Sequence, residues 1–273
     1  MKRWLLCWAA VAASLAQAAA MRPPITEAET EVVDGVRAAV RSGDCALAVK
    51  RLNAGLPAKY PDLLLLAGAM YEHGVCLKAN WDRAARMYSL AHDVGHQAGA
   101  YRLVAGYALP GGQPSAALWW ASKFQPSLLP ETCRSGVAVV DDVDSFAATL
   151  AAWPAARLQG CNYVVGVLAA VVGEMDYPSE AQHFRLRGAV GMSFVPAEPA
   201  MTWSTQEFEV VPFSGVVDGD SVRDRNSSVL RKTFERHLES LGKAALQRYP
   251  KPAEGVDPGW RMGRQFVFDL KLK

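Results

Sequence analysis

The sequence lacks the short motifs that accompany most common catalytic and nucleotide-binding sites. No Gly-x-Ser-x-Gly turn, phosphate-binding loop or dinucleotide fingerprint occurs in the 273 residues. Only five histidines are present, and they form no convergent constellation with other reactive side chains. We therefore predict that the protein is not an enzyme, with no catalytic residue and no cofactor.

The chain also lacks a recognisable set of metal ligands. His92 and His96 stand four residues apart, but Gly95 is expected to end the helix between them, and no carboxylate or cysteine completes the set. The acidic run Asp141 to Asp144 has neither the spaced ligands nor the closing glutamate of a calcium loop. It fits the first turn of a helix, where acidic side chains interact favourably with the helix dipole. We therefore predict no metal site.

No basic block or stripe is present, which removes the electrostatic footprint of a nucleic-acid-binding protein. The formal charge is +2, and residues 1–20 contribute Lys2 and Arg3 but no acid, so the charge of the remaining chain is zero. No run of about 18 uncharged apolar residues follows. We predict no nucleic-acid partner and no transmembrane segment in the mature chain.

Residues 1–20 have the layout of a secretory signal peptide. Lys2 and Arg3 precede an apolar run from Trp4 to Leu15, and Ala16-Gln17-Ala18 or Ala18-Ala19-Ala20 supplies a cleavage site. We predict a periplasmic location in a Gram-negative envelope. An uncleaved, anchoring N-terminus is the alternative.

Four cysteines follow the predicted signal peptide, and an even number in an exported chain indicates disulfides. Three pairings are possible. Because Cys45 and Cys76 lie in one half of the chain and Cys133 and Cys161 in the next, we favour the local pairs 45–76 and 133–161.

Small and aromatic residues recur at helical spacing from Pro61 onward, and the pattern then starts again. Tyr71 and Ala84 in the first copy correspond to Tyr107 and Ala116 in the second, a period of about 34 residues that is typical of helix–turn–helix arrays. One hairpin cannot bury its own apolar face, so neighbouring hairpins must stack. We predict an all-α helical-repeat domain over residues 21–130, in which "GDCALAVKRLNAGL", with Asp44 as N-cap, is a partial first repeat.

The segments "AGAMYEHG", "DRAARMYSLAHDVG" and "AGAYRLVAGYA" resemble the Sel-one-like repeats, which are short relatives of tetratricopeptide repeats, over roughly residues 44–123. This resemblance implies binding to other proteins rather than catalysis. The expected contact surface is the concave face of the array, around Tyr71, Tyr88, Tyr107 and Trp120, whereas Trp119 is expected in the core.

The resemblance also implies that the stretch "YEHGVCLKANW" has a structural role rather than a catalytic or metal-binding one. Residues 75–80 would form a loop that Cys76 ties to Cys45 at the start of the preceding helix. Such a bridge would contribute on the order of 3 kcal/mol in the chain-entropy model. Glu72 and His73 are then expected to be exposed turn residues.

After Pro130 the pattern changes. We expect a helix over "SFAATLAAWPAARLQG" that ends at Gly160, and a further helix over residues 164–172, where a buried strand is the alternative. Two strands follow, the first alternating from Gly188 to Phe194 and the second in "QEFEVVPF". An amphipathic helix capped by Ser227 or Ser228 and a last strand, "RQFVFDLKL", complete the chain.

This order of elements, together with "YPSEAQHFRLRGAVGMSF", resembles the TonB C-terminal domain. The matching positions are Tyr177, Pro178, Ala181, Gly188, Val190, Met192 and Phe194. The resemblance implies a small α+β domain over residues 131–273 whose exposed edge strand, around Phe266, Val267 and Phe268, accepts a partner strand. The predicted fold class is therefore α+β overall, with the all-α repeat domain first.

Together these patterns favour a periplasmic, non-catalytic adaptor or scaffold for protein–protein interaction. The expected partner is an envelope protein or peptide, with peptidoglycan as a further candidate. Two alternatives stay open. One is an anchored TonB-like energy transducer, and the other is an envelope hydrolase or β-lactam-binding protein.

Overall fold

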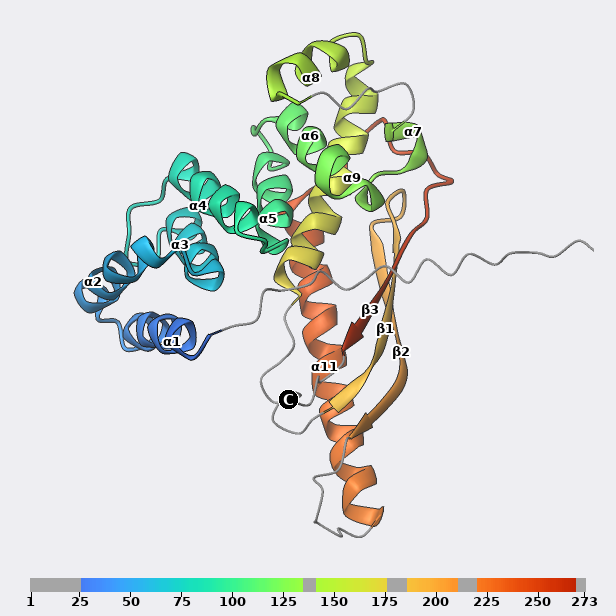
Figure 1. Cartoon of the computed structure of the whole chain (residues 1–273). Coiled ribbons are helices and arrows are strands. Elements are labelled where there is room, and N and C mark those ends of the chain that lie inside the picture. Colours follow the sequence, from blue (N-terminus) through green and yellow to red (C-terminus); the bar gives the residue numbers. More distant parts are fainter. Residues whose placement is uncertain (1–25, 135–140, 176–185, 211–219, 269–273) are drawn as a thin grey trace, which may run out of the picture.

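The computed structural model describes residues 26–134, 141–175, 186–210 and 220–268. The fold is α+β, as predicted: helices α1 to α9 come first, and a three-stranded antiparallel sheet with the long helix α11 follows (Figure 1). The predicted signal peptide lies outside the described residues.

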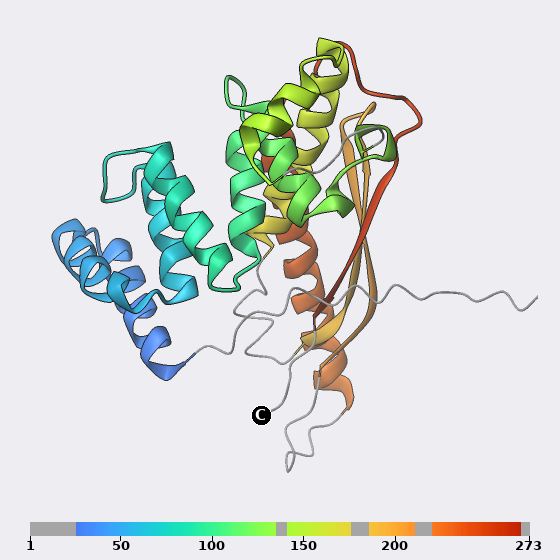
Figure 2. The same cartoon turned by 45° about the horizontal axis from the view of Figure 1, so that its top comes forward.

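The helical part begins with three pairs of consecutive helices. They are α1 (Glu27–Arg41), α2 (Cys45–Gly55), α3 (Pro61–His73), α4 (Trp81–Asp93), α5 (Ala98–Tyr107) and α6 (Pro114–Phe124), with short 3-10 turns at Leu56–Ala58 and Pro126–Leu128. The pairs lie side by side along the array (Figures 1 and 2). The partial first repeat is completed by α1, which the repeat pattern did not predict.

Local sequence signals set the ends of these helices. Asp44 caps α2 by accepting a hydrogen bond from the Leu47 amide at 2.9 Å, and Asn80 caps α4 in the same way through Arg83. Gly74, at a φ of 69°, ends α3 in the left-handed conformation that glycine adopts easily. The predicted loop over residues 75–80 is thus confirmed.

Close helix contact within the second pair depends on a small residue. Gly68 on α3 faces the ring of Tyr88 on α4, and a Cβ at this position would overlap the ring. The two helices can therefore approach closely only because position 68 has no side chain.

A second group of helices consists of α7 (Glu131–Arg134), α8 (Val143–Leu150) and α9 (Ala155–Glu174). The helix predicted over "SFAATLAAWPAARLQG" is wrong, because the segment contains the end of α8 and the start of α9. Pro154 lacks an amide hydrogen and directly precedes α9, where that hydrogen is not needed. Gly160 lies inside α9 and gives room for the backbone of Gly255 rather than ending a helix.

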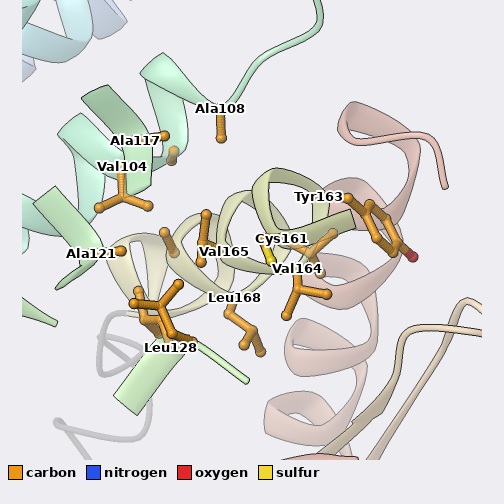
Figure 3. Close-up of a cluster of buried hydrophobic side chains, with 14 of the residues drawn as sticks. Val104, Ala108, Ala117, Ala121, Leu128, Cys161, Tyr163, Val164, Val165 and Leu168 are labelled. Atoms are coloured by element: carbon orange, nitrogen blue, oxygen red, sulfur yellow. The ribbon is translucent and has the colours of Figure 1, made fainter. Parts of the chain in front are cut away.

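Helix α9 is the centre of the largest core, and the helix predicted over residues 164–172 is confirmed as part of it (Figure 3). Val164, Val165 and Leu168 are buried in this core, which also contains side chains of α5, α6 and the turn at Leu128. Among the described helices, α9 is the one long and apolar enough to cross a membrane, but 61% of its apolar window is buried inside the protein. The position of α9 at the centre of the core explains why the helix is so apolar.

The sheet consists of β1 (Leu186–Val195), β2 (Ala200–Val210) and β3 (Met262–Phe268), in the order β2-β1-β3. Val190, Met192 and Phe194 on the central strand are buried, which confirms the predicted alternation. Helix α11 (Asp220–Arg248) packs on this side of the sheet and contributes Phe234 and Leu238 (Figure 1). The predicted cap at Ser227 or Ser228 is wrong, since α11 begins at Asp220.

The largest core crosses the predicted domain boundary at residue 130. It joins Val104 and Leu118 of the helical pairs to Val165 of α9, Phe194 of β1 and Tyr249 after α11. The last pair of the array, α5 and α6, and the sheet therefore share one packed interior.

The two disulfides join Cys45 to Cys76 and Cys133 to Cys161, which confirms the predicted pairing. Cys133 and Cys161 are 2% and 0% exposed and belong to the main core. Cys45 is exposed at the first turn of α2, and Cys76 is half-buried in the loop after α3. Two native disulfides indicate an oxidising compartment outside the cytoplasm.

Candidate functional site

The four residues predicted to form the contact surface of the array come together in one aromatic cluster. Tyr88 is its buried centre, and Tyr71, Tyr107 and Trp120 pack around it as half-buried side chains. Tyr88 is 0% exposed, so it adds no surface of its own, contrary to the prediction. The accessible part of the cluster consists of the other three side chains.

Trp81 belongs to the same cluster and was missed by the sequence analysis. Its ring meets that of Tyr107 edge-on, with 5.2 Å between the centroids, and lies 6.4 Å from that of Tyr88. Such aromatic pairs each stabilise by about 0.5–1.5 kcal/mol beyond the burial of their area. The spacing of Trp81, Ala84 and Tyr88 on one helical face was the available signal.

Further aromatic side chains connect α4 to α6. His92 lies 4.4 Å from Phe124 and 5.6 Å from Trp120, measured between ring centroids. Burial lowers the pKa of His92 although the nearby Asp93 acts in the opposite direction, and its Nδ1 atom is buried without a hydrogen-bond partner in the described part of the chain. Trp119 lies in the core, as predicted, with the ammonium of Lys123 4.9 Å from its ring centroid.

Beneath the aromatic cluster lies a buried polar network centred on Glu72. The Glu72 side chain is only 7% exposed, which corrects the prediction of an exposed turn residue. Its carboxylate accepts a hydrogen bond of 2.7 Å from the Tyr88 hydroxyl and another from the guanidinium of Arg248. The physical reason for the burial is this distant cation at the end of α11, which no local pattern reveals.

The network continues to α5 and α9. Arg248 also lies 3.6 Å from Glu174, and Arg102 donates to the same carboxylate at 3.0 Å. The Tyr249 hydroxyl donates to the Ala105 carbonyl oxygen at 2.6 Å. The end of α11 is therefore fastened to α3 and α5, and it covers this part of the array with the protein's own chain.

Electrostatics in the network follow from burial and from charge pairing. Burial alone would raise the pKa of Glu72, but the hydrogen bonds from Tyr88 and Arg248 and the positive charge of Arg248 outweigh it, so the pKa is lowered. Burial is the largest cause that raises the pKa of Tyr88, and the negative charge of Glu72 is the next. Glu72 is thus held as a carboxylate, and Tyr88 as a neutral donor.

Two of the polar residues considered as metal ligands, His96 and Asp142, have structural partners instead. His96 Nε2 lies 3.1 Å from Asp62 Oδ1, and the amide of Asp62 donates to Glu29. Asp142 caps α8 through the Ser145 amide at 2.8 Å, as expected of a helix start. Within the described ranges no group of three His, Cys, Asp or Glu side chains is arranged to hold a metal ion.

The predicted edge strand is at the edge of the sheet. Among the described strands β3 pairs only with β1, with Phe266 opposite Val190 and Val267 opposite Ala189. Phe266 is half-buried against the main core, and Val267 points the other way with 60% of its surface exposed. The side chain of Phe268 lies outside the described part of the structure.

An arginine connects this edge to the helices. Arg264 donates to the Ser127 hydroxyl and to the Tyr101 hydroxyl, each at 2.8 Å. Beyond it the outer face of the sheet carries small or polar exposed side chains such as Ser193, Thr202, Ser204 and Gln265. Among the described residues of that face, Val267 is the large apolar side chain that is exposed rather than half-buried.

Comparisons with protein-family models, with curated proteins and with solved structures found no match. What the structure supports is therefore the architecture: a mostly helical region of paired helices followed by a small antiparallel sheet.

Proposed function

We propose that the protein is a periplasmic, non-catalytic adaptor that holds another envelope protein through the edge of its sheet, with the helical array as a second contact surface. The observation that carries the proposal is the position of β3, at the sheet edge and with Val267 exposed. An edge strand has backbone amide and carbonyl groups available to an added strand.

Three features make β3 a suitable docking strand. Arg264 holds it in place from the side of the helices, which reduces the entropy lost when a partner strand binds. Phe266 packs inward and anchors the strand to the core. Val267 would offer an apolar contact to an added strand on the outer face, among residues that are otherwise polar.

The array surface supports the same class of function. Tyr71, Tyr107 and Trp120 are large aromatic side chains with part of their surface accessible, and aromatic residues are enriched at protein contact sites. The end of α11 covers the neighbouring part of the array, so a partner would bind at the aromatic rim formed by these three residues. The resemblances to Sel-one-like repeats and to the TonB C-terminal domain point to the same two modes of binding.

Site-specific photo-crosslinking in the native envelope tests this proposal. A photoreactive amino acid is placed at Val267 on the edge and, separately, at Ser193 on the central strand β1, which is exposed on the same face. We expect a defined protein adduct at position 267 that is absent at 193. The crosslinked peptide should be an extended segment of the partner.

A lysine at position 267 provides a second readout, because charged residues on edge strands oppose strand addition. Val267→Lys should abolish capture of the partner identified by crosslinking, whereas Ser193→Lys should retain it. Equal adducts at both positions, or peptidoglycan as the only captured material, would contradict an adaptor that works through the edge.

A further inference from the structure

The two disulfides differ in a way that the proposed function does not require. Cys133 and Cys161 are fully enclosed in the main core, whereas Cys45 is exposed and Cys76 is half-buried. A thiolate must reach a sulfur atom to exchange with it, so exposure decides which of the two bonds is open to attack in the folded protein.

The environment of the accessible bond also favours a local response. The bridge ties the start of α2 to the loop between α3 and α4. Helix α2 packs mainly on α1, and α1, α2 and part of α3 enclose a small core, with Val36 and Leu52, that is separate from the main core. This end of the array can loosen while α5 to α9 stay packed.

The backbone at Cys76 adds a second observation. Its φ is 58°, in the left-handed region that residues with a Cβ seldom adopt because the Cβ comes close to the backbone carbonyl oxygen. It persists where the surroundings impose it, and the bond to Cys45 is one such restraint. Breaking that bond removes one of the restraints that hold the loop in this conformation.

We propose that the Cys45–Cys76 disulfide is a site of reversible thiol–disulfide exchange with a dithiol reductant, and that its reduction loosens the α1–α2 end of the array. A thiolate of the reductant attacks Sγ of exposed Cys45 and forms a mixed disulfide, while Sγ of Cys76 leaves with the bonding electron pair and takes up a proton. The second thiol of the reductant then displaces Cys45. The products are two protein thiols and one oxidised dithiol, a transfer of two electrons.

Selective reduction of the folded, oxidised, full-length protein tests the proposal. Dithiothreitol is added in graded concentrations without denaturant, free thiols are alkylated, and the modified peptides are quantified by mass spectrometry. Cys45 and Cys76 should be labelled at least roughly ten-fold faster than Cys133 and Cys161, because the buried pair must wait for the core to open. Simultaneous labelling of all four cysteines would overturn the proposal.

Two further readouts check the direction of attack and its consequence. Glutathione, a monothiol, should be trapped as a mixed disulfide on Cys45; trapping on Cys76 instead would contradict the assigned direction. Amide hydrogen exchange after selective reduction should rise in α1, α2 and the loop over residues 74–80, but not in α9. Unchanged exchange there would show that the bond can be reduced without any effect on the array, against the proposal.

The double variant Cys45→Ser with Cys76→Ser is the matched control. It should reproduce the exchange pattern of the reduced protein without any reductant, and dithiothreitol should have no further effect on it. An exchange pattern like that of the oxidised protein would overturn the proposed role of the bond. Should the variant not fold during export, the measurements on the native chain alone decide the question.

Discussion

Glu72 shows how one side chain connects the two ends of the protein. Its carboxylate is almost inaccessible to solvent, and it is held by a neutral hydroxyl from α4 and by a guanidinium from α11. A buried charge of this kind is stable only while its partners remain, since desolvation would otherwise expel it. The ionised Glu72 therefore contributes to the docking of α11, together with Glu174 and the hydrogen bond of Tyr249.

Glu72→Gln should destabilise the protein by about 2–4 kcal/mol, because it leaves the Arg248 charge with Glu174 as its remaining acidic partner. Denaturant unfolding at neutral pH measures the change. Glu31→Gln, at a solvent-exposed position on α1, is the control and should have almost no effect.

The same pair predicts a dependence on pH. The pKa of Glu72 is lower in the folded protein than its ordinary value of 4.5, so its contribution to stability is complete above pH 4.5. That contribution is lost as the pH falls through the lower folded-state pKa. The loss of stability on acidification below pH 4.5 should be smaller in Glu72→Gln than in the native protein, and an equally steep loss in both would contradict the prediction.

Gly68→Ala should destabilise by about 1–3 kcal/mol, because the added methyl group would overlap the buried ring of Tyr88. Gly35→Ala is the matched control. It lies in α1, where the nearest atoms belong to the exposed Arg51 side chain, which donates to the Gly35 carbonyl and needs to shift only slightly for the methyl group, and alanine favours a helix there. Thermal unfolding of the two variants should therefore shift in opposite directions or by clearly different amounts.

At the scale of elements, β3 is held to the rest of the protein by the central strand and by an arginine. It pairs with β1, and Arg264 joins it to the turn at Ser127 and to Tyr101 on α5. The proposed docking strand is therefore positioned by the helical array as well as by the sheet.

Arg264→Ala should loosen β3 by about 1–3 kcal/mol, since two hydrogen bonds from a charged donor are lost. Hydrogen exchange in β3 should rise, with little change in α9. Arg261→Ala is the control, because Arg261 bonds only to carbonyl groups of its own turn among the described contacts. Equal exchange in both variants would show that Arg264 does not hold the strand.

Local elements could be predicted from the sequence because their causes are local. The cap at Asp44 and the alternation along β1 depend on neighbouring residues alone. The burial of Glu72 could not be predicted, since its cation is 176 residues away. The helix boundary at Pro154 was missed for a related reason: Gly160 was taken as a helix end, when its role is to admit the backbone of Gly255 in the folded protein.

At the scale of the whole molecule, α9 unites the two parts that the sequence suggested as separate domains. It packs on α5 and α6 on one side and on α11 on the other. Helices α5 and α6 and the sheet unit are therefore expected to unfold together rather than in sequence.

Truncation tests this cooperativity. A chain ending at residue 130 would expose the faces of α5 and α6 that α9 covers, so it should be aggregated or largely unfolded. A chain ending at residue 175 keeps α9 and should retain more helix. Circular dichroism and size-exclusion chromatography compare the two, and a well-folded, monomeric 21–130 fragment would show that the boundary separates independent units.

The bond between Glu72 and Arg248 also has a consequence for the order in which the protein is assembled. A ribosome makes the chain from the N-terminus, so the array is synthesised long before the cation that its acid requires. Until Arg248 is made, Glu72 lacks the cation that pairs with it, and the surface that α11 will cover stays open. The final turn of α11 thus closes a structure begun by some of the first helices, and the array reaches its finished form only after Arg248 has been made.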